Sequence, residues 1–545
     1  MKTTEIKIKK LKEIISRDAL MRKEQQKIVH TDGSESSWLF DFRNIFLKPE
    51  SLNLIVDIFW DLFGEKYPFQ IGGQEIAAIP LTSAIVFKSQ QLNKSVNGFI
   101  IRKSRKPVGM QKLIEGELNE NKIILVDDLI NSGSTILRQI KIIENAGKKV
   151  DCVFVLTRFK DEEHYKFLAE KQIKLVSLFN LNDFGLSYTE KKQNVLPQNF
   201  EIKWYSQSKN PNLFYVVPKS APALDEDKIY FGSDNGYFWA LNQENGEIVW
   251  KYKVGLHVHG KSIFSSPAIY DGVVYFGSYD GNVYALDTQT GKRKWVFFEA
   301  DWVGSSPAIA PDLGLLFIGL EFGLFKKKGG IAALDLKTGK KKWEYREISE
   351  YVHCSPAYCP EKKLVAIGAN DFYIYLFDAK TGKLKWKFKI EGEIKSSLTF
   401  DVKNNLLLFG SFDKNFYALD IDSGELKGKY QTYDMIYSAP LVYKDNAYFS
   451  SFDKNLYSLN LKTGALNWRF SANGRFLASP IIIEDKIYIG AFDGKLYEID
   501  IQTGKMTGWF QTVERIVNKI AYNPKTKKFF LSTYANEIYC LEKIS

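Results

Sequence analysis

A glycine that recurs every 40 to 48 residues constrains the fold of the C-terminal part of this chain more than any other feature. It falls at Gly246, Gly291, Gly339, Gly382, Gly424, Gly464 and Gly504. Short runs of strand character separate these glycines, as in DGVVYFGSYDGNVYALDTQTGKRKW at 271–295. A repeat of four short strands with this period predicts the blades of a β-propeller.

The ends of the repeat region predict how such a ring closes. Residues 517–545 supply three strand-like runs and lack the fourth, whereas Trp204 lies in an isolated run one repeat length before Trp250. Trp204 therefore has the position of the missing fourth strand. We expect eight blades closed by the strand around Trp204, with seven as the alternative, because closure removes exposed strand edges.

The repeat also carries a motif. Ala285-Leu286-Asp287 leads through Thr290-Gly291 to Trp295, and this resembles the docking motif of PQQ-like propellers over about residues 198–545. The resemblance implies an all-β propeller and says little about function. The quinone-dependent enzymes of this fold share a pair of adjacent cysteines, which this chain lacks. We expect no PQQ, and a protein or ligand partner of unknown identity.

The first part of the chain has a different hydrophobic pattern. Strand-like runs alternate with helix-period segments, as at 122–126 and 136–146, then at 150–156 and 162–171. This alternation predicts βαβ units and a parallel sheet flanked by helices. We therefore expect an α/β domain at 1–195 and the propeller at 196–545.

One stretch of this domain predicts a ligand site. Residues 123–135 read IILVDDLINSGST, a buried strand that ends in two acids before a turn and a helix. Asp127 and Asp128 can accept hydrogen bonds from two vicinal hydroxyls. The following turn offers backbone N–H groups and hydroxyls to a phosphate. The pattern suits a ribose 5′-phosphate, and the alternative is an ordinary strand–turn–helix with acids at its cap.

The stretch resembles the motif with which type I phosphoribosyltransferases bind 5-phosphoribosyl 1-pyrophosphate (PRPP). The basic run 102–116 resembles the mobile catalytic loop of the orotate phosphoribosyltransferases, and Gly72-Gly73-Gln74-Glu75 is similar to their pyrophosphate loop. The segment from Gly33 to Arg43 resembles the part that wraps the nucleobase. These elements occur in family order over about residues 8–190.

The resemblance implies a role for each matching residue. Catalysis falls to Lys106, Arg102, Lys103, Asp127 and Asp128. The ribose and 5′-phosphate of PRPP fall to Asp127, Asp128, Asn131, Ser132, Gly133, Ser134 and Thr135, and the pyrophosphate to Gly73, Gln74, Glu75, Arg102, Lys103 and Lys106. The base falls to Phe40, Asn131 and Arg158. Mg²⁺ is expected to reach Asp127 and Asp128 indirectly, through the PRPP that carries it.

Three positions depart from the family pattern. Val108 replaces a histidine of the loop, Thr31 replaces a lysine that helps to hold substrate, and Asn131 replaces a threonine beside the base. These departures leave PRPP binding as the expectation and leave the identity of the acceptor base open.

Composition narrows the remaining choices. The net charge of +11 is spread over both parts of the chain, so no concentrated basic stripe predicts a nucleic-acid site. The N-terminus lacks an apolar signal region, and no run approaches transmembrane length. We expect a cytoplasmic protein without a membrane segment.

The leading hypothesis is an Mg²⁺-dependent phosphoribosyltransferase that transfers phosphoribosyl from PRPP to orotate or a related pyrimidine and releases pyrophosphate. The family's loop reaches into the neighbouring subunit, which implies a homodimer. The propeller would recruit a partner or sense a ligand. The alternative is a non-catalytic PRPP or nucleotide sensor, or a scaffold, that signals through the propeller.

Overall fold

The computed structural model describes residues 2–22, 28–29, 35–36, 38–102, 113–131, 133–186, 198–206, 220–255, 262–324 and 326–544. The chain divides into two compact units, Met1–Val195 and Leu196–Ser545. None of the helices in the described part is long and apolar enough to cross a membrane. The cytoplasmic location stays a prediction.

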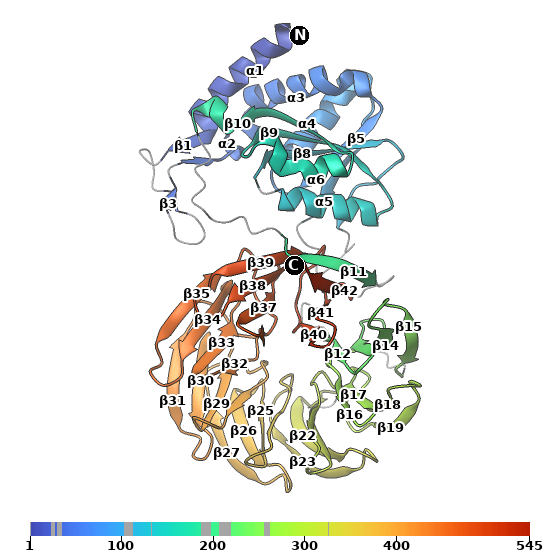
Figure 1. Cartoon of the computed structure of the whole chain (residues 1–545), viewed down its shortest axis with the longest axis vertical. Coiled ribbons are helices and arrows are strands. Elements are labelled where there is room, and N and C mark those ends of the chain that lie inside the picture. Colours follow the sequence, from blue (N-terminus) through green and yellow to red (C-terminus); the bar gives the residue numbers. More distant parts are fainter. Residues whose placement is uncertain are drawn as a thin grey trace. The chain divides into compact units, whose positions relative to one another are not determined.

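The N-terminal unit is an α/β domain (Figure 1). Its helices are α1 (Lys2–Ile14), α2 (Arg43–Phe46), α3 (Pro49–Phe63), α4 (Ala78–Gln91), α5 (Ser134–Asn145) and α6 (Lys166–Glu170), with single turns of other helix types at Ile15–Ala19, Gly64–Lys66, Glu162–Tyr165 and Leu181–Phe184. Its strands are β1 (Leu20–Arg22), β2 (Ile28–Val29), β3 (Glu35–Ser36), β4 (Trp38–Phe40), β5 (Phe69–Gln74), β6 (Gly98–Ile101), β7 (Ile114–Glu115), β8 (Lys122–Ile130), β9 (Val150–Arg158) and β10 (Lys174–Asn180).

The central sheet has the order β10-β9-β8-β5-β6-β7. Strands β10 to β6 are parallel, as expected, and the short edge strand β7 is antiparallel to β6. The connection from β5 to β6 runs toward one edge, and those from β8 to β9 and from β9 to β10 run toward the other. Right-handed crossovers therefore place α4 on one face and α5 and α6 on the opposite face (Figure 1).

Sequence composition explains why the sheet is buried on both faces. The run Ile123 to Val126 of β8 is wholly buried, as is Val153 to Leu156 of β9, which is typical of parallel strands covered by helices. On the α3 side, Phe59 and Phe63 pack on Phe154 with ring centroids 5.4 and 5.8 Å apart. This core fixes the strands whose ends form the candidate site.

The C-terminal unit is a propeller with four antiparallel strands in each blade. The blades follow one another around the ring, and the strands of each blade run from the centre to the rim (Figure 1). The first blade consists of β12 (Ala223–Leu224), β13 (Lys228–Gly232), β14 (Tyr237–Asn242) and β15 (Ile248–Lys253), and the second of β16 (Ala268–Tyr270), β17 (Val273–Gly277), β18 (Val283–Asp287) and β19 (Arg293–Phe297). The third blade consists of β20 (Ala308–Ala310), β21 (Leu315–Phe322), β22 (Lys328–Asp335) and β23 (Lys341–Ile348). The fourth consists of β24 (Ala357–Cys359), β25 (Leu364–Gly368), β26 (Tyr373–Asp378) and β27 (Leu384–Lys389).

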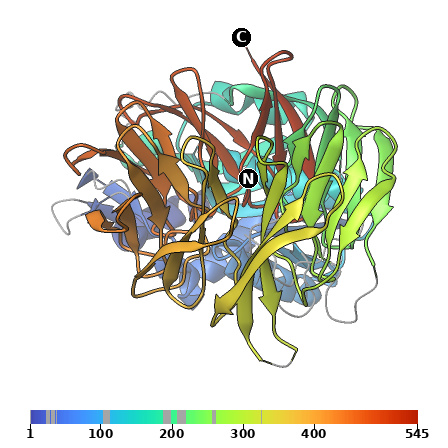
Figure 2. The ribbon, with the colours of Figure 1, turned by 90° about the horizontal axis from the view of Figure 1, so that it is seen from below.

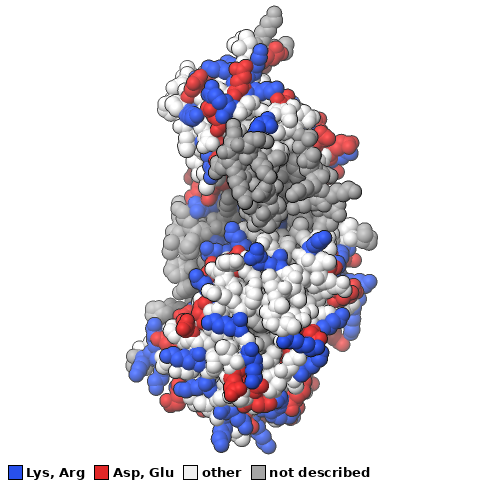
Figure 3. Space-filling view, turned by 90° about the vertical axis from the view of Figure 1, so that its left-hand side faces the viewer, with Lys and Arg blue, Asp and Glu red and all other residues white. Residues whose placement is uncertain are grey.

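The next three blades are β28 (Thr399–Asp401), β29 (Leu406–Gly410), β30 (Asn415–Asp420) and β31 (Leu426–Gln431); β32 (Leu441–Tyr443), β33 (Asn446–Ser450), β34 (Asn455–Asn460) and β35 (Leu466–Ser471); and β36 (Ile481–Ile483), β37 (Lys486–Gly490), β38 (Lys495–Asp500) and β39 (Met506–Gln511). The long hairpin of β21 and β22, in yellow, extends beyond its neighbours (Figure 2). On the face that Figure 3 presents, acidic and basic side chains are intermixed over the propeller.

The eighth blade combines both ends of the unit. Strands β40 (Ala521–Asn523), β41 (Lys528–Ser532) and β42 (Ile538–Lys543) are completed by β11 (Phe200–Ser206). Strand β11 pairs antiparallel with β42, from Phe200 opposite Lys543 to Ser206 opposite Ile538. The prediction of eight blades closed by the strand around Trp204 is confirmed, and seven blades is wrong.

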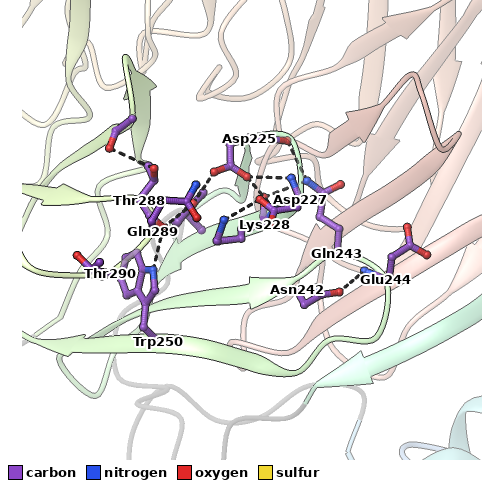
Figure 4. A network of polar contacts seen from close by, with 12 residues as sticks. Asp225, Asp227, Lys228, Asn242, Gln243, Glu244, Trp250, Thr288, Gln289 and Thr290 are labelled. Atoms are coloured by element: carbon purple, nitrogen blue, oxygen red, sulfur yellow. Dashed lines mark hydrogen bonds and ion pairs between the residues drawn. The ribbon is translucent and has the colours of Figure 1, made fainter.

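The tryptophan–glycine motif docks each blade on the next. Trp250 Nε1 donates to the carbonyl oxygen of Thr288 at 2.9 Å (Figure 4). Gly291 packs so tightly on this indole that a Cβ there would lie 2.6 Å from it. The same pair recurs for Trp204, Trp295, Trp343, Trp386 and Trp468 with the glycine of the following blade. At the fifth blade Gly428 takes the tryptophan position, and a Cβ on Gly464 opposite would meet nothing within 4 Å.

Two glycine-to-alanine variants separate the docking contact from backbone strain. Gly291 and Gly464 have nearly the same positive φ, 67° and 69°, so alanine costs each roughly 1–2 kcal/mol through its backbone. Gly291→Ala must in addition displace Trp250. We expect it to lower the thermal unfolding midpoint well beyond the effect of Gly464→Ala, measured by scanning calorimetry. Equal shifts for the two variants would contradict the docking role.

Candidate functional site

Two carboxylates lie side by side near the C-terminal end of β8. Asp127 stands opposite Val155 of β9, and the pairing of the two strands continues to Ile130 opposite Arg158. The strand is therefore four residues longer than the apolar run indicates, and it carries both acids within the sheet. The Asp128 backbone N–H donates to Asp127 Oδ1 at 2.9 Å.

The site raises the pKa of both acids. Asp127 is only 8% exposed, and burial, followed by the charge of Asp128, raises its pKa well above the usual value. Burial likewise raises the pKa of Asp128. Buried Gln139 of α5 makes only a long hydrogen bond to Asp127 Oδ2, at 3.5 Å. One oxygen of each acid accepts a backbone N–H, from Asp128 to Asp127 and from Leu129 to Asp128 at 2.8 Å, and hydroxyl groups of a ligand or a cation at the remaining oxygens would stabilise the charged form of the pair.

The turn after β8 places a helix N-terminus beside these acids. Gly133 has φ 79° and precedes α5, and a Cβ there would come within 2.7 Å of Phe167. The hydroxyl of Tyr165 donates to the carbonyl oxygens of Ile130 and Asn131, at 3.0 and 2.9 Å, and so holds the turn in place. The first backbone N–H groups of a helix have no partner within it, so this turn can receive an anion.

Strand β5 brings a second loop to the same edge. A Cβ on Gly73 would lie 2.1 Å from the carbonyl oxygen of Val126, so only glycine lets β5 approach β8 this closely. Gln74 ends the strand, and the Glu75 backbone N–H donates to the Ile101 carbonyl oxygen of β6 at 3.1 Å. The connections from β5 and from β8 diverge here, so the crevice between these two strands is the switch point at which α/β sheets bind ligands.

The start of the basic loop, at Arg102, lies next to the crevice between β5 and β8. Ile101 pairs with Ile114 of β7, and the Arg102 N–H donates to the Leu113 carbonyl oxygen at 2.8 Å. The Arg102 guanidinium lies 3.5 Å from Glu75 Oε1 and from Glu115 Oε1. Residues 103–112, with Lys103, Lys106 and Val108, lie outside the described residues.

Arg138 of α5 connects these parts. Its Nη1 donates to Gln74 Oε1 at 3.1 Å and to the Arg102 carbonyl oxygen at 3.2 Å. The side chain is 8% exposed. One buried guanidinium from the helix that starts at the anion-binding turn thus holds both the end of β5 and the start of the basic loop.

Aromatic residues form the far side of the site. Trp38 packs edge-on against Phe159 with centroids 5.4 Å apart, and Phe159 N–H donates to the Ile130 carbonyl oxygen at 3.0 Å. Phe40 is 7% exposed and stacks on Phe42, so it belongs to the core, and Trp38 is the more accessible ring. Arg158, at the end of β9, forms an ion pair with Glu162 at 3.3 Å.

The fold brings most of the predicted site residues to one edge of the sheet. Asp127, Asp128, Gly133, Gly73, Gln74, Glu75 and Arg102 are linked by the contacts above, and Asn131, Thr135 and Arg158 follow the same strand ends. Ser134 begins α5. Ser132 and Thr31 lie outside the described residues. Among those described, no group of three or more His, Cys, Asp or Glu is arranged to hold a metal ion.

Sequence reasoning missed Arg138, Gln139 and Tyr165. Arg138 and Gln139 lie between the buried Ile136 and Ile140 of α5, so polar residues on the face of a helix that packs on the sheet were the available signal. Tyr165 had no such signal, because its contact joins segments 34 residues apart.

Comparison with known proteins agrees with this geometry. The N-terminal part is 29% identical over 175 residues to the orotate phosphoribosyltransferase of Aquifex aeolicus, an alignment that covers 32% of this chain and 95% of that protein. It is 31% identical over 148 residues to the orotate phosphoribosyltransferase of Pyrococcus horikoshii, covering 26% and 75%.

The propeller has its own relatives. A family profile described as the β-propeller of beta-alanine-activating enzyme matches residues 326–545, and one described as outer membrane protein assembly factor BamB matches residues 201–351. The crystal structure of BamB from Moraxella catarrhalis superposes with a TM-score of 0.51 at 19% identity, covering 63% of this chain and 97% of that one. At this identity the likeness concerns the fold alone.

The paired acids, the anion-binding turn and the two flanking loops thus occur in a unit that aligns with nearly the whole length of known enzymes. The predicted family resemblance is confirmed for both units. Through its N-terminal unit, this chain belongs to the orotate phosphoribosyltransferase family.

Proposed function

We propose that the N-terminal unit is an Mg²⁺-dependent enzyme that transfers phosphoribosyl from PRPP to orotate or a related pyrimidine and releases pyrophosphate. This proposal rests on three features that meet at the β5–β8 switch point: the Asp127–Asp128 pair, the N-terminus of α5, and Arg102 with its partners Glu75 and Glu115, which we call the Arg102 cluster. A ribose with phosphates at both ends needs these three kinds of group at one place.

Each group suits one part of PRPP. Asp127 and Asp128 accept hydrogen bonds from the two ribose hydroxyls, which add to the backbone donors of this buried pair. The turn from Asn131 to Thr135 receives the 5′-phosphate at the N-terminus of α5. Binding at both ends holds the C1′ carbon over the crevice, so positioning alone contributes to the rate.

The loop after β5 and the basic loop bind the pyrophosphate leaving group. Departure of pyrophosphate places negative charge on its oxygens and positive charge on the ribose ring. Arg102, with Lys103 and Lys106 of the same loop, neutralises the departing anion, and Gly73, Gln74 and Glu75 border it at the end of β5. Glu75 and Glu115 hold the Arg102 guanidinium in place until substrate arrives.

The donor set fits Mg²⁺. Asp127 and Asp128 would face an Mg²⁺ ion carried by PRPP, through that ligand, and a cation near this buried pair would stabilise its charged form. The chemistry that a PRPP-bound Mg²⁺ would supply is neutralisation of the pyrophosphate oxygens. For the acceptor base we propose Asn131, Arg158 and the segment 38–40, in which Trp38 rather than the buried Phe40 is the accessible ring.

We propose a homodimer, as the family resemblance implies, and a propeller that recruits a partner or senses a ligand. The cytoplasm is the proposed location.

Turnover decides between an enzyme and a sensor. Incubation of the full chain with PRPP, Mg²⁺ and a panel of orotate, uracil, cytosine and purine bases is expected to release pyrophosphate with orotate or another pyrimidine, at a rate that Lys106→Ala lowers by about 10²-fold or more. Pyrophosphate release is measured by a coupled phosphate assay. PRPP binding without release for any base would sink the enzyme and favour the sensor.

Asp127→Asn tests the acid pair. We expect kcat/KM for PRPP to fall roughly 10- to 100-fold, the effect of losing a charge-assisted hydrogen bond. Asp151→Asn is the control, because Asp151 lies at the start of β9 and accepts the Ile123 N–H at the opposite end of β8 from the site. In the wild-type protein, the affinity for PRPP should rise with pH through the raised pKa values of the pair, and Asp127→Asn should weaken this dependence. Unchanged pH profiles would contradict the role of the pair.

The same substitution should stabilise the unliganded protein near neutral pH. The folded pKa of Asp127 lies above its unfolded value, so the folded state binds more protons and the free energy of unfolding falls as pH rises through the folded pKa. Asparagine removes that cost. A thermal unfolding midpoint at pH 7.5 that is lower in Asp127→Asn than in the wild type would contradict the assignment.

Arg138→Met tests the link between the loops. We expect a rise of about 10-fold in KM for PRPP with little change in KM for the base, because the two pyrophosphate-side loops lose their common anchor. Arg138→Lys, which retains a cation but not the planar guanidinium, should recover part of the loss. Exposed Lys149→Met is the control. A uniform loss of activity with both KM values unchanged would indicate a merely structural role.

A further inference from the structure

A cavity of about 1140 Å³ lies at the centre of the propeller, within the C-terminal unit. Its walls come from the innermost strands and the loops that lead into them, with residues of all eight blades. These strands face the centre of the ring in Figure 1. We call this cavity the channel.

The ionisable lining of the channel is one-sided. Its described wall includes His353, Lys395 and Lys519, and no aspartate or glutamate. A polar cavity with cationic walls concentrates anions, since the surrounding protein focuses the field. The excess of positive charge at this place contrasts with the mixed charges on the outer face of Figure 3.

Two of these side chains already have acidic partners. Lys395 Nζ lies 2.6 Å from Glu393 Oε2, and its ammonium also lies over the ring of Phe412 at 4.8 Å. His353 Nδ1 lies 3.3 Å from Glu321 Oε2. Neither carboxylate is among the described residues that line the channel, and Glu393 offsets the positive charge of Lys395.

Lys519 is different. Its side chain is exposed, but it opens into the channel, and burial by the surrounding protein lowers the pKa of its ammonium. No described residue gives this ammonium a hydrogen bond or an ion pair. An ammonium that lines the channel and is only partly desolvated would be stabilised by an anion held there.

Serine hydroxyls of other blades line the same channel as this lysine. Ser266, Ser306, Ser355 and Ser479 each accept a backbone N–H from the preceding blade through Oγ, at 2.8 to 3.0 Å. Their own O–H protons have no acceptor among the described residues, and all four line the channel. A hydroxyl whose oxygen already accepts is available as a donor.

Apolar side chains complete the wall. Leu477 and Val517 cluster with Tyr437 and Phe452, and all four line the channel. The site therefore combines one uncompensated cation, several hydroxyl donors and an apolar surface, the usual make-up of a pocket for a small organic molecule.

We propose that the channel of the propeller binds a small organic anion, a carboxylate or a phosphate ester with an apolar body, through Lys519 and the serine hydroxyls. This site is separate from the one at the end of β8 and does not depend on the activity proposed for the N-terminal unit. It gives the propeller a ligand of its own.

Hydrogen exchange of the full chain locates the site. The probes are orthophosphate, orotate, benzoate and uridine 5′-monophosphate, each at millimolar concentration. At least one organic probe should protect the channel segments around residues 351–357 and 515–522, whether or not it also protects residues 127–137. Protection of the N-terminal segment alone, or of neither, would overturn the proposal.

Variants then test the lysine. Lys519→Gln should weaken the binding of the protecting probe about 10-fold or more in calorimetric titration, and Lys519→Arg should restore it. Lys340→Gln, which removes the same charge from an exposed turn of the propeller, should leave it unchanged. Circular dichroism confirms that each variant is folded. Equal affinity in Lys519→Gln and the wild type would overturn the assignment to this channel.

Discussion

The antiparallel pairing of β11 with β42 holds the propeller closed, because it joins strands from opposite ends of the unit into one blade. Without it, β42 would be left as an unpaired outer strand, and the first blade would lose its contact with Trp204. Buried Glu498 reinforces the seam, where it accepts a hydrogen bond from Asn199 at 3.0 Å and forms an ion pair with Lys543 at 2.9 Å. Trp204, on β11, extends the seam to the first blade through the Gln243 carbonyl oxygen.

The candidate active site depends on a comparable constraint, the close approach of β5 and β8. Gly73 permits this approach, and the divergence of the two connections leaves a crevice in front of both strand ends. Asp127, the turn before α5 and the Arg102 cluster all face this crevice from different segments. Arg138 joins two of these segments directly, so the arrangement exists before substrate binds.

Much of this could be predicted from local sequence. The spacing between Trp204 and Trp250 predicted the closing strand, and the run before Asp127 predicted a buried strand followed by a helix, because periodicity reports local structure. The segment 162–171 was predicted as one helix but divides into a single turn and α6. Contacts such as Arg138 with Gln74 join residues 64 positions apart, and no local pattern encodes them. The partnerless Lys519 is likewise visible only once eight blades surround it.

The fusion places an enzyme-family domain and a closed propeller with its own polar channel on one chain, and the central claim is that the end of β8 holds PRPP. A crystal structure of the full chain with PRPP and Mg²⁺ tests it most directly. The account predicts both ribose hydroxyls within hydrogen-bonding distance of Asp127 and Asp128, and the 5′-phosphate at the turn before α5. PRPP bound elsewhere, or with its ribose turned away from the two acids, would contradict the account.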